Sequence, residues 1–135
     1  MGKGSFEATF SVKNISYYPQ GPRIAEGVTI GFRDPMSAQS PTMFVFVKLD
    51  MVAPRVGKPV EFASPPKSAK IKFIYNDLTR RWRMFYGLNG AEPTTEFPGS
   101  IEGIQWPEPT SESCAAYVLM SNGSVDLDHF EIKPL

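Results

Sequence analysis

Proline and glycine interrupt this chain so regularly that they exclude long helices. Thirteen prolines and eleven glycines fall at intervals among its 135 residues. Proline removes a backbone donor and clashes with the preceding helical turn, and glycine costs conformational entropy, so a helix longer than about three turns would not fit between them. Aromatic residues make up 13% of the chain and favour a pleated, half-buried surface. We therefore expect an all-β protein.

Several stretches alternate apolar and polar residues with the two-residue period of a β-strand. Clean alternation covers residues 6–12 and 26–32, and residues 14–24 and 33–42 read as loops. In residues 43–51, Met43, Val45, Val47, Leu49 and Met51 share one face, and this face is expected to be core. A short edge strand is expected around residues 60–62.

The second half of the chain contains two expected hairpins and a long loop. Residues 69–90 predict one hairpin with a polar turn near residues 76–80, followed by a proline-rich stretch over residues 91–113. The last two strands, 114–120 and 124–132, are joined by an Asn-Gly dipeptide that is typical of a tight hairpin turn. About eight short strands in 135 residues predict one β-sandwich or jelly-roll domain over residues 1–135, large enough to bury a core.

The charge and cysteine content narrow the class of partner. Fourteen basic residues balance fourteen acidic ones, so no excess charge favours nucleic acid or an anionic membrane, and no run of about 18 apolar residues predicts a membrane span. Cys114 is the single cysteine, so neither an internal disulfide nor a cysteine-based zinc site can form. The sequence does not indicate the cellular compartment, because the first residues lack the apolar core of a signal peptide. An extracellular or periplasmic location is expected if the domain comes from a secreted protein.

The order of features in the second half resembles the concanavalin A-like superfamily of lectins, glucanases and laminin-G-like modules. The residues that carry the resemblance are the strand "KIKFIYN", the turn and aromatic strand "TRRWRMFYGLNG", and the closing strand "GSVDLDHFEI". The resemblance implies an antiparallel, two-sheet β-sandwich with one concave face. Many members of the superfamily bind carbohydrate, some hydrolyse glycosides, and others have no catalytic activity, so the resemblance predicts the fold rather than one function.

The closing strand places three acids and the single histidine within six positions. Asp126, Asp128 and Glu131 have the spacing D-x-D-x-x-E, which resembles the E-x-D-x-x-E strand of laminarinase-type glucanases. A retaining glycosidase needs two carboxyls about 5–5.5 Å apart. Strict alternation puts Asp126 and Asp128 on one face and Glu131 with His129 on the other, so only a bulge would unite them. Glycoside hydrolysis through Asp126 and Glu131 is thus one hypothesis.

A metal site at the same strand is a second hypothesis. Asp126 and Asp128 could both reach one Ca²⁺, but His129 would point the other way. Calcium takes six to eight oxygen ligands, so loops would have to supply the rest. We therefore assign no metal ligand and no resident cofactor from the sequence.

Aromatic residues in loops give a better indication of a ligand. Sugar rings stack their apolar faces on aromatic side chains, while their hydroxyls need polar neighbours. Trp82 alternates with Met84 and is expected in the core, but five other residues are candidate glycan contacts: Tyr17, Tyr18, Arg83, Gln105 and Trp106.

The sequence thus favours a non-catalytic, carbohydrate-binding module, and three classes of function stay open. A structural or protein-interaction module that self-associates is the alternative, because Phe44, Phe46, Ile74 and Phe85 occupy the second faces of strands and could form one exposed patch. A glycoside hydrolase is the second alternative. The expected partners are a glycan and a second copy of the chain, but not nucleic acid or a membrane.

Overall fold

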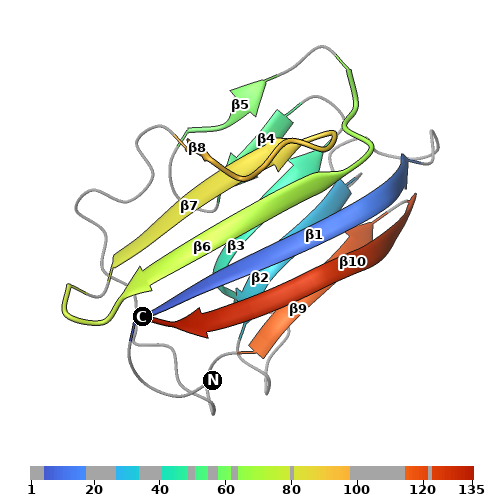
Figure 1. Cartoon of the computed structure of the whole chain (residues 1–135). Helices are drawn as coiled ribbons and strands as arrows, with labels where there is room; N and C mark the ends of the chain where they lie inside the picture. The colour runs from blue at the N-terminus through green and yellow to red at the C-terminus, as the bar shows by residue number, and fades with distance from the viewer. Residues whose placement is uncertain are drawn as a thin grey trace.

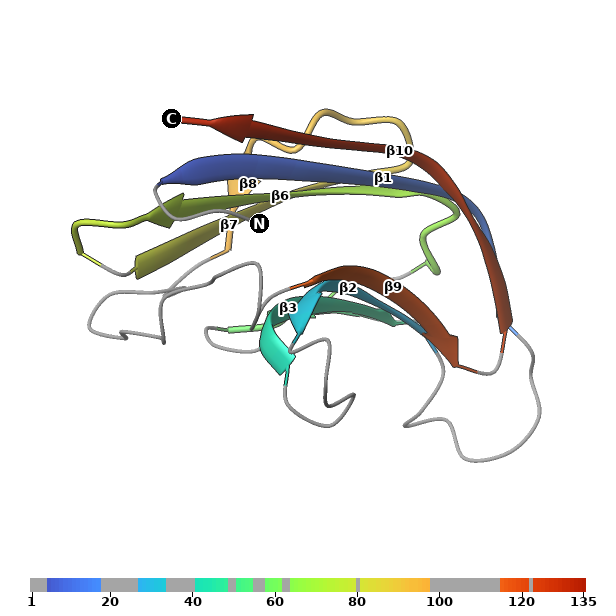
Figure 2. The same ribbon diagram turned by 90° about the horizontal axis from the view of Figure 1, so that it is seen from below.

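A computed structural model describes most of the chain and confirms the all-β prediction. The described residues are 5–17, 27–33, 41–48, 51–54, 58–61, 64–79, 81–97, 115–121 and 123–135. Within them, two antiparallel sheets of five strands each pack face to face as a sandwich (Figures 1 and 2). No helix in these ranges has the length and apolar character that crossing a membrane requires.

Sheet A contains both ends of the described chain. Its strand order is β10-β1-β6-β7-β8. The register places Phe6 opposite Pro134 on one side and opposite Tyr75 on the other, so β1 lies between the last strand and the central hairpin (Figure 1). The strands are β1 (Phe6–Tyr17), β6 (Ala69–Asn76), β7 (Arg81–Leu88), β8 (Thr95–Glu96) and β10 (Gly123–Pro134).

Sheet B is built from the segments between these strands. Its strand order is β5-β4-β3-β2-β9, and every neighbouring pair is antiparallel. Figure 2 shows β2 and β9 arching beneath sheet A. The strands are β2 (Gly27–Arg33), β3 (Pro41–Lys48), β4 (Met51–Pro54), β5 (Val60–Glu61) and β9 (Ala115–Ser121).

An aromatic cluster fills the space between the sheets. The ring of Phe32 on β2 lies 5.5–5.7 Å, between centroids, from four rings of sheet A, mostly edge to face. Such geometry adds to the free energy of burying the rings. The four rings are Phe6, Phe10, Phe73 and Trp82, and all five residues are buried. Trp82 and Met84 therefore lie in the core, as the alternation of β7 predicts.

Three local predictions were wrong. The final two strands do not form a hairpin, because β9 pairs with β2 in sheet B while β10 pairs with β1 in sheet A, so the connection near the Asn-Gly dipeptide crosses between sheets. Strand β1 continues through the expected loop to Tyr17, because Asn14 adopts a positive φ of 54° and a register shift restores the pairing with β10. Residues 43–51 are not one strand: β3 ends at Lys48, and Met51 begins β4, which pairs back on β3.

Candidate functional site

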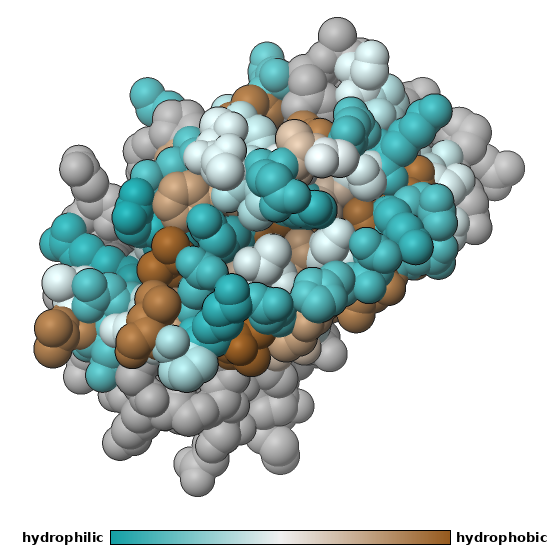
Figure 3. All heavy atoms as spheres, in the orientation of Figure 1, coloured by the Kyte–Doolittle hydropathy of each residue, from teal (hydrophilic) through white to brown (hydrophobic). Residues whose placement is uncertain are grey.

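The outer face of sheet A, which faces away from sheet B, is rich in polar side chains. The inward residues of β1 and β6 are buried apolar ones, so strict alternation presents Thr9, Ser11, Lys70 and Lys72 outward. Figure 3 shows hydrophilic side chains over most of this face. We call it the polar face.

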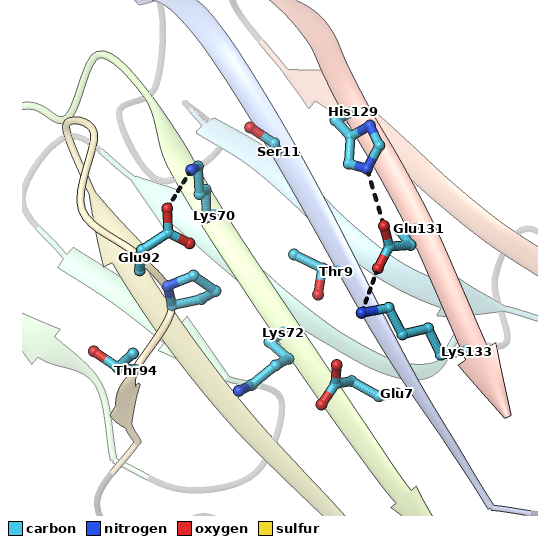
Figure 4. Close-up of a pocket in the computed structure, with 11 residues that line it drawn as sticks. Glu7, Thr9, Ser11, Lys70, Lys72, Glu92, Thr94, His129, Glu131 and Lys133 are labelled. Carbon is cyan, nitrogen blue, oxygen red and sulfur yellow. Dashed lines mark hydrogen bonds and ion pairs between the residues drawn. The ribbon is translucent and has the colours of Figure 1, made fainter. Parts of the chain in front are cut away.

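A shallow groove of about 540 Å³ crosses the polar face. Its floor comes from β1 and β6, and its two sides from β10 and from the segment before β8 (Figure 4). Ten of the eleven lining residues carry a side-chain hydrogen-bonding group, so the groove offers many donors and acceptors. The lining residues are Glu7, Thr9, Ser11, Lys70, Lys72, Glu92, Pro93, Thr94, His129, Glu131 and Lys133.

The side of the groove at residues 91–94 depends on Gly87. A Cβ atom at Gly87 would lie 2.3 Å from the carbonyl oxygens of both Ala91 and Glu92. Only a residue without a side chain lets this segment lie so close to β7. The amide of Phe97 then donates to the carbonyl of Met84, which fixes the segment to the sheet. The sequence prediction of a proline-rich loop over residues 91–113 did not indicate that it returns over the sheet.

Two sets of ion pairs face each other across the groove. Lys70 contacts Glu92 at 3.0 Å on one side. On the other side Glu131 contacts Lys133 at 2.9 Å and His129 at 3.6 Å (Figure 4). The ammonium group of Lys133 is the main reason that the pKa of Glu131 lies below its usual value. These groups are therefore already arranged to offer both donors and acceptors to a ligand.

Lys72 lies on the floor of the groove, and its ammonium group differs from those of its neighbours. It lies 4.6 Å from the centroid of the Phe85 ring, a cation–π contact. Among the described residues, no carboxylate forms an ion pair with it. Lys72 thus presents a cation whose hydrogen-bonding capacity is not taken up by an acid.

Arg83, a predicted glycan contact, lies on the polar face next to this lysine. Its guanidinium carbon lies 5.0 Å from the centroid of the same Phe85 ring, and the guanidinium donates two hydrogen bonds of 2.8 and 3.0 Å to Glu96. The bond to Glu96 raises the pKa of Arg83 and lowers that of Glu96. Arg83 adjoins the groove without lining it, and its fork of donors is already occupied by Glu96.

Tyr17, another predicted contact, lies far from Arg83. Its half-buried ring packs against the core, and its hydroxyl donates to the carbonyl of Pro66 at 3.3 Å. Burial raises the pKa of Tyr17 to about 12. Arg83 lies opposite Ile74, and Ile74 lies opposite Glu7 of β1, so Arg83 is level with Glu7 in the sheet. Glu7 comes ten residues before Tyr17 on the same strand, so Arg83 and Tyr17 are roughly 30 Å apart along the strand direction. One small glycan cannot contact both residues. Tyr18, Gln105 and Trp106 lie outside the described residues, so their roles stay predictions.

A bulge in β10 changes the predicted arrangement of its acids. Ser11 lies opposite His129, but Val12 lies opposite Leu127, so Asp128 is an extra residue in β10. The carboxylate of Asp128 contacts Lys13 at 3.1 Å and accepts a hydrogen bond from Ser11. The bulge therefore turns Asp128 to the polar face, where His129 and Glu131 also lie.

The same geometry argues against hydrolysis through Asp126 and Glu131. Asp126 lies opposite Lys13 and Glu131 opposite Thr9, which are four residues apart on β1, or about 13 Å. Both retaining and inverting glycosidases need shorter carboxyl separations. Asp126 accepts a hydrogen bond from Asn14, which is further from Thr9 than Lys13 is. In addition, the pKa of Glu131 is lowered, whereas a general acid needs a raised pKa.

A metal site at β10 is not supported either. Within the part of the chain that the structure describes, no three histidine, cysteine, aspartate or glutamate side chains are placed to hold a metal ion. Lys13 forms an ion pair with Asp128 and lowers the pKa of Asp128, so the Asp128 carboxylate already has a cationic partner. The described residues around β10 therefore give no support to the Ca²⁺ site that the sequence left open.

The four apolar residues expected to form one patch lie on opposite faces of the sandwich. Phe44 and Phe46 belong to β3 and point away from sheet A, whereas Ile74 and Phe85 lie on the polar face of sheet A. Two packed layers separate the pairs, so they cannot bind one partner together. Phe46 instead packs near Gly27, and Lys48 lies over its ring at 5.8 Å.

Comparisons with known proteins identify the fold and leave the function open. No family model matches the chain, and no curated protein matches its sequence. Among solved structures, a sheep galectin-11 complex with glycerol is 8% identical with a TM-score of 0.51, over 96% of this chain and 90% of the galectin. The lectin UEA-II complexed with galactose is 11% identical with a TM-score of 0.54, over 97% of this chain and 72% of the lectin. The predicted concanavalin A-like fold is therefore confirmed.

Proposed function

We propose that this chain, a concanavalin A-like β-sandwich, is a non-catalytic glycan-binding module that uses the groove on the polar face. The observation that carries the proposal is the lining of the groove. Donors and acceptors from four segments of the chain surround an open channel that contains no bulky aliphatic side chain. Sugar hydroxyls both donate and accept hydrogen bonds, so such a lining matches their chemistry.

The similarity to lectin structures supports this class of ligand. The galectin and UEA-II structures share the fold at 8% and 11% identity, and the second of them holds galactose. Identity this low carries the fold alone, so the groove and not the likeness selects the residues that we propose as contacts: Thr9, Ser11, Lys70, Lys72 and His129.

Lys72 is proposed as the strongest single contact. Its ammonium group has no ion-pair partner among the described acids, so a ligand oxygen could accept from it without breaking an existing ion pair. A hydrogen bond to a charged group contributes about 1.5–3 kcal/mol, which corresponds to about tenfold or more in affinity.

A glycan array followed by calorimetric titration tests the proposal. We expect the intact protein to bind at least one glycan, and Lys72→Met to weaken that binding by about tenfold or more. Lys48→Met is the matched control, because Lys48 also lies over an aromatic ring but on sheet B. An array without binding at high protein concentration, or equal losses in the two variants, would contradict the proposal.

The loop aromatics remain part of the proposal as stacking residues. Trp106→Ala is expected to weaken binding of the same glycan, because an indole ring can pack against the apolar face of a sugar ring. Unchanged affinity in Trp106→Ala would restrict the site to the groove.

A further inference from the structure

Strand β10 is an exposed edge, and its exposure requires an explanation. It is the last strand of sheet A, and within the described ranges only β1 pairs with it in that sheet. It has twelve residues, and every one from Asp126 to Pro134 is exposed. A long edge strand with free backbone groups is a template for pairing with another chain, and proteins usually shorten or cover such edges.

A row of apolar side chains follows this edge. Leu127, Phe130 and Ile132 lie opposite the buried residues Val12, Phe10 and Ala8 of β1, so they point toward the interior side of the sandwich. They are nevertheless 57%, 38% and 40% exposed, because the sandwich is open along this edge. Apolar spheres are visible below β10 along the lower margin of the described surface in Figure 3.

The backbone groups of the same residues point to the free edge. The amide of Leu135 donates to the carbonyl of Ser5 on the β1 side. Antiparallel pairs alternate between hydrogen-bonded and non-bonded, so Lys133, Glu131 and His129 bond toward β1. The N–H and C=O groups of Phe130 and Ile132 therefore face away from sheet A, where a further strand would lie.

We infer that β10 pairs with β10 of a second copy, antiparallel about a two-fold axis at Phe130. In this register Phe130 lies opposite the same residue of the other copy. The bulge at Asp128 then sets Ile132 opposite Leu127, so the apolar row of one copy meets that of the other. An interface about a two-fold axis must be complementary to itself, and this row is.

The charges on the polar side of β10 select this register. With the axis at Phe130, the ammonium group of Lys133 in one copy lies opposite the carboxylate of Asp126 in the other, and Glu131 lies opposite the imidazole of His129, which carries an N–H donor. Opposite charges in directly facing positions stabilise a strand pair. A shift of the axis by one residue would instead place Glu131 opposite itself, and like charges in that position destabilise the pair. The inference does not rest on the proposed glycan binding.

Sedimentation equilibrium over a range of protein concentrations tests the pairing. We expect the wild type to form a species of twice the 15.0 kDa chain mass at high concentration. Ile132→Lys is expected to give a monomer, since it puts a cation into the apolar row while its exposed position preserves the fold. Leu78→Lys is the matched control, because Leu78 is 94% exposed at the β6–β7 turn, away from this edge.

A charge exchange tests the register itself. His129→Glu alone and Glu131→Lys alone should each raise the dissociation constant, because the first sets two carboxylates opposite each other and the second removes the carboxylate that faces His129. The double variant His129→Glu/Glu131→Lys should restore it. A wild-type monomer at all concentrations, or a dimer that Ile132→Lys leaves intact, would overturn the inference, as would a double variant weaker than both single ones. Circular dichroism verifies that each variant is folded.

Discussion

Replacing Gly87 with alanine tests how the groove is built. The added Cβ atom would lie 2.3 Å from two carbonyl oxygens, while ordinary contact begins at 3.4 Å. The overlap is thus about 1 Å with two backbone atoms, which cannot rotate away as a side chain can. Overpacking of a fitted contact costs typically about 1–3 kcal/mol.

The lost contacts of the displaced segment add to this cost. If residues 91–94 move away, the ion pair between Lys70 and Glu92 is lost, but Glu92 is 73% exposed, so this loss adds at most about 0.5 kcal/mol. We therefore expect Gly87→Ala to lower the free energy of unfolding by about 2–3 kcal/mol. Any glycan bound in the groove should bind more weakly in the same variant.

Urea denaturation at pH 7 measures the change in the free energy of unfolding. Gly90→Ala is the control, because a Cβ atom at Gly90 meets nothing within 4 Å and only its positive φ of 94° is strained. That strain costs about 1 kcal/mol. A Gly87→Ala variant as stable as the wild type, or no less stable than Gly90→Ala, would refute the view that close backbone approach holds this segment in place.

Three further predictions concern the core and two titrating groups. Phe32→Ala should lower the free energy of unfolding by about 3–5 kcal/mol in a denaturant titration, because Phe32 touches four rings of the opposite sheet, and a loss under 1 kcal/mol would contradict the packing. The pKa of Glu96 is lowered by Arg83, so the stability from this pair is present above the ordinary pKa of Glu96 and is lost as the pH falls through the lowered value. Between pH 6 and pH 3, the free energy of unfolding measured in urea should therefore fall less in Glu96→Gln than in the wild type. Burial raises the pKa of Tyr17 to about 12, so the contribution of its neutral hydroxyl to stability is complete below pH 10 and is lost as the pH rises toward 12. The thermal midpoint of Tyr17→Phe should therefore fall less than that of the wild type over this range. An equal fall in both proteins would refute the burial of this hydroxyl.

The alternation of residues allowed most of the fold to be predicted. Phe6, Phe10, Phe73 and Trp82 all lie on the buried faces that their strand periods indicate. Burial on one face of a strand fixes the period of its apolar residues, so this information is local and can be read from one sequence. Such a pattern does not say which sheet receives each strand. The hairpin predicted after Met120 was wrong for this reason, because β9 and β10 alternate equally well in two different sheets.

The candidate site depended on features that alternation cannot reveal. The bulge at Asp128 reverses the face of the residues before it, and no residue type near Asp128 demands a bulge. The return of residues 91–94 over the polar face depends on one glycine, which in the sequence resembles any other glycine of a strand end. Lys70 and Glu92 become neighbours only through that return, so their positions in the sequence offer no reason to group them.

The pairing of β1 with β10 also orders the events of folding. Phe6 lies opposite Pro134, so the first strand pairs with the last across nearly the whole described chain. Contacts of such long sequence separation form slowly, because the entropy of closing the loop must be overcome first. During synthesis β1 can pair with β6 on one side, but its other side waits until residues 123–134 have left the ribosome. While the chain is still being made, β1 is therefore the edge strand of this sheet. Once β10 has paired with it, β10 becomes the edge strand.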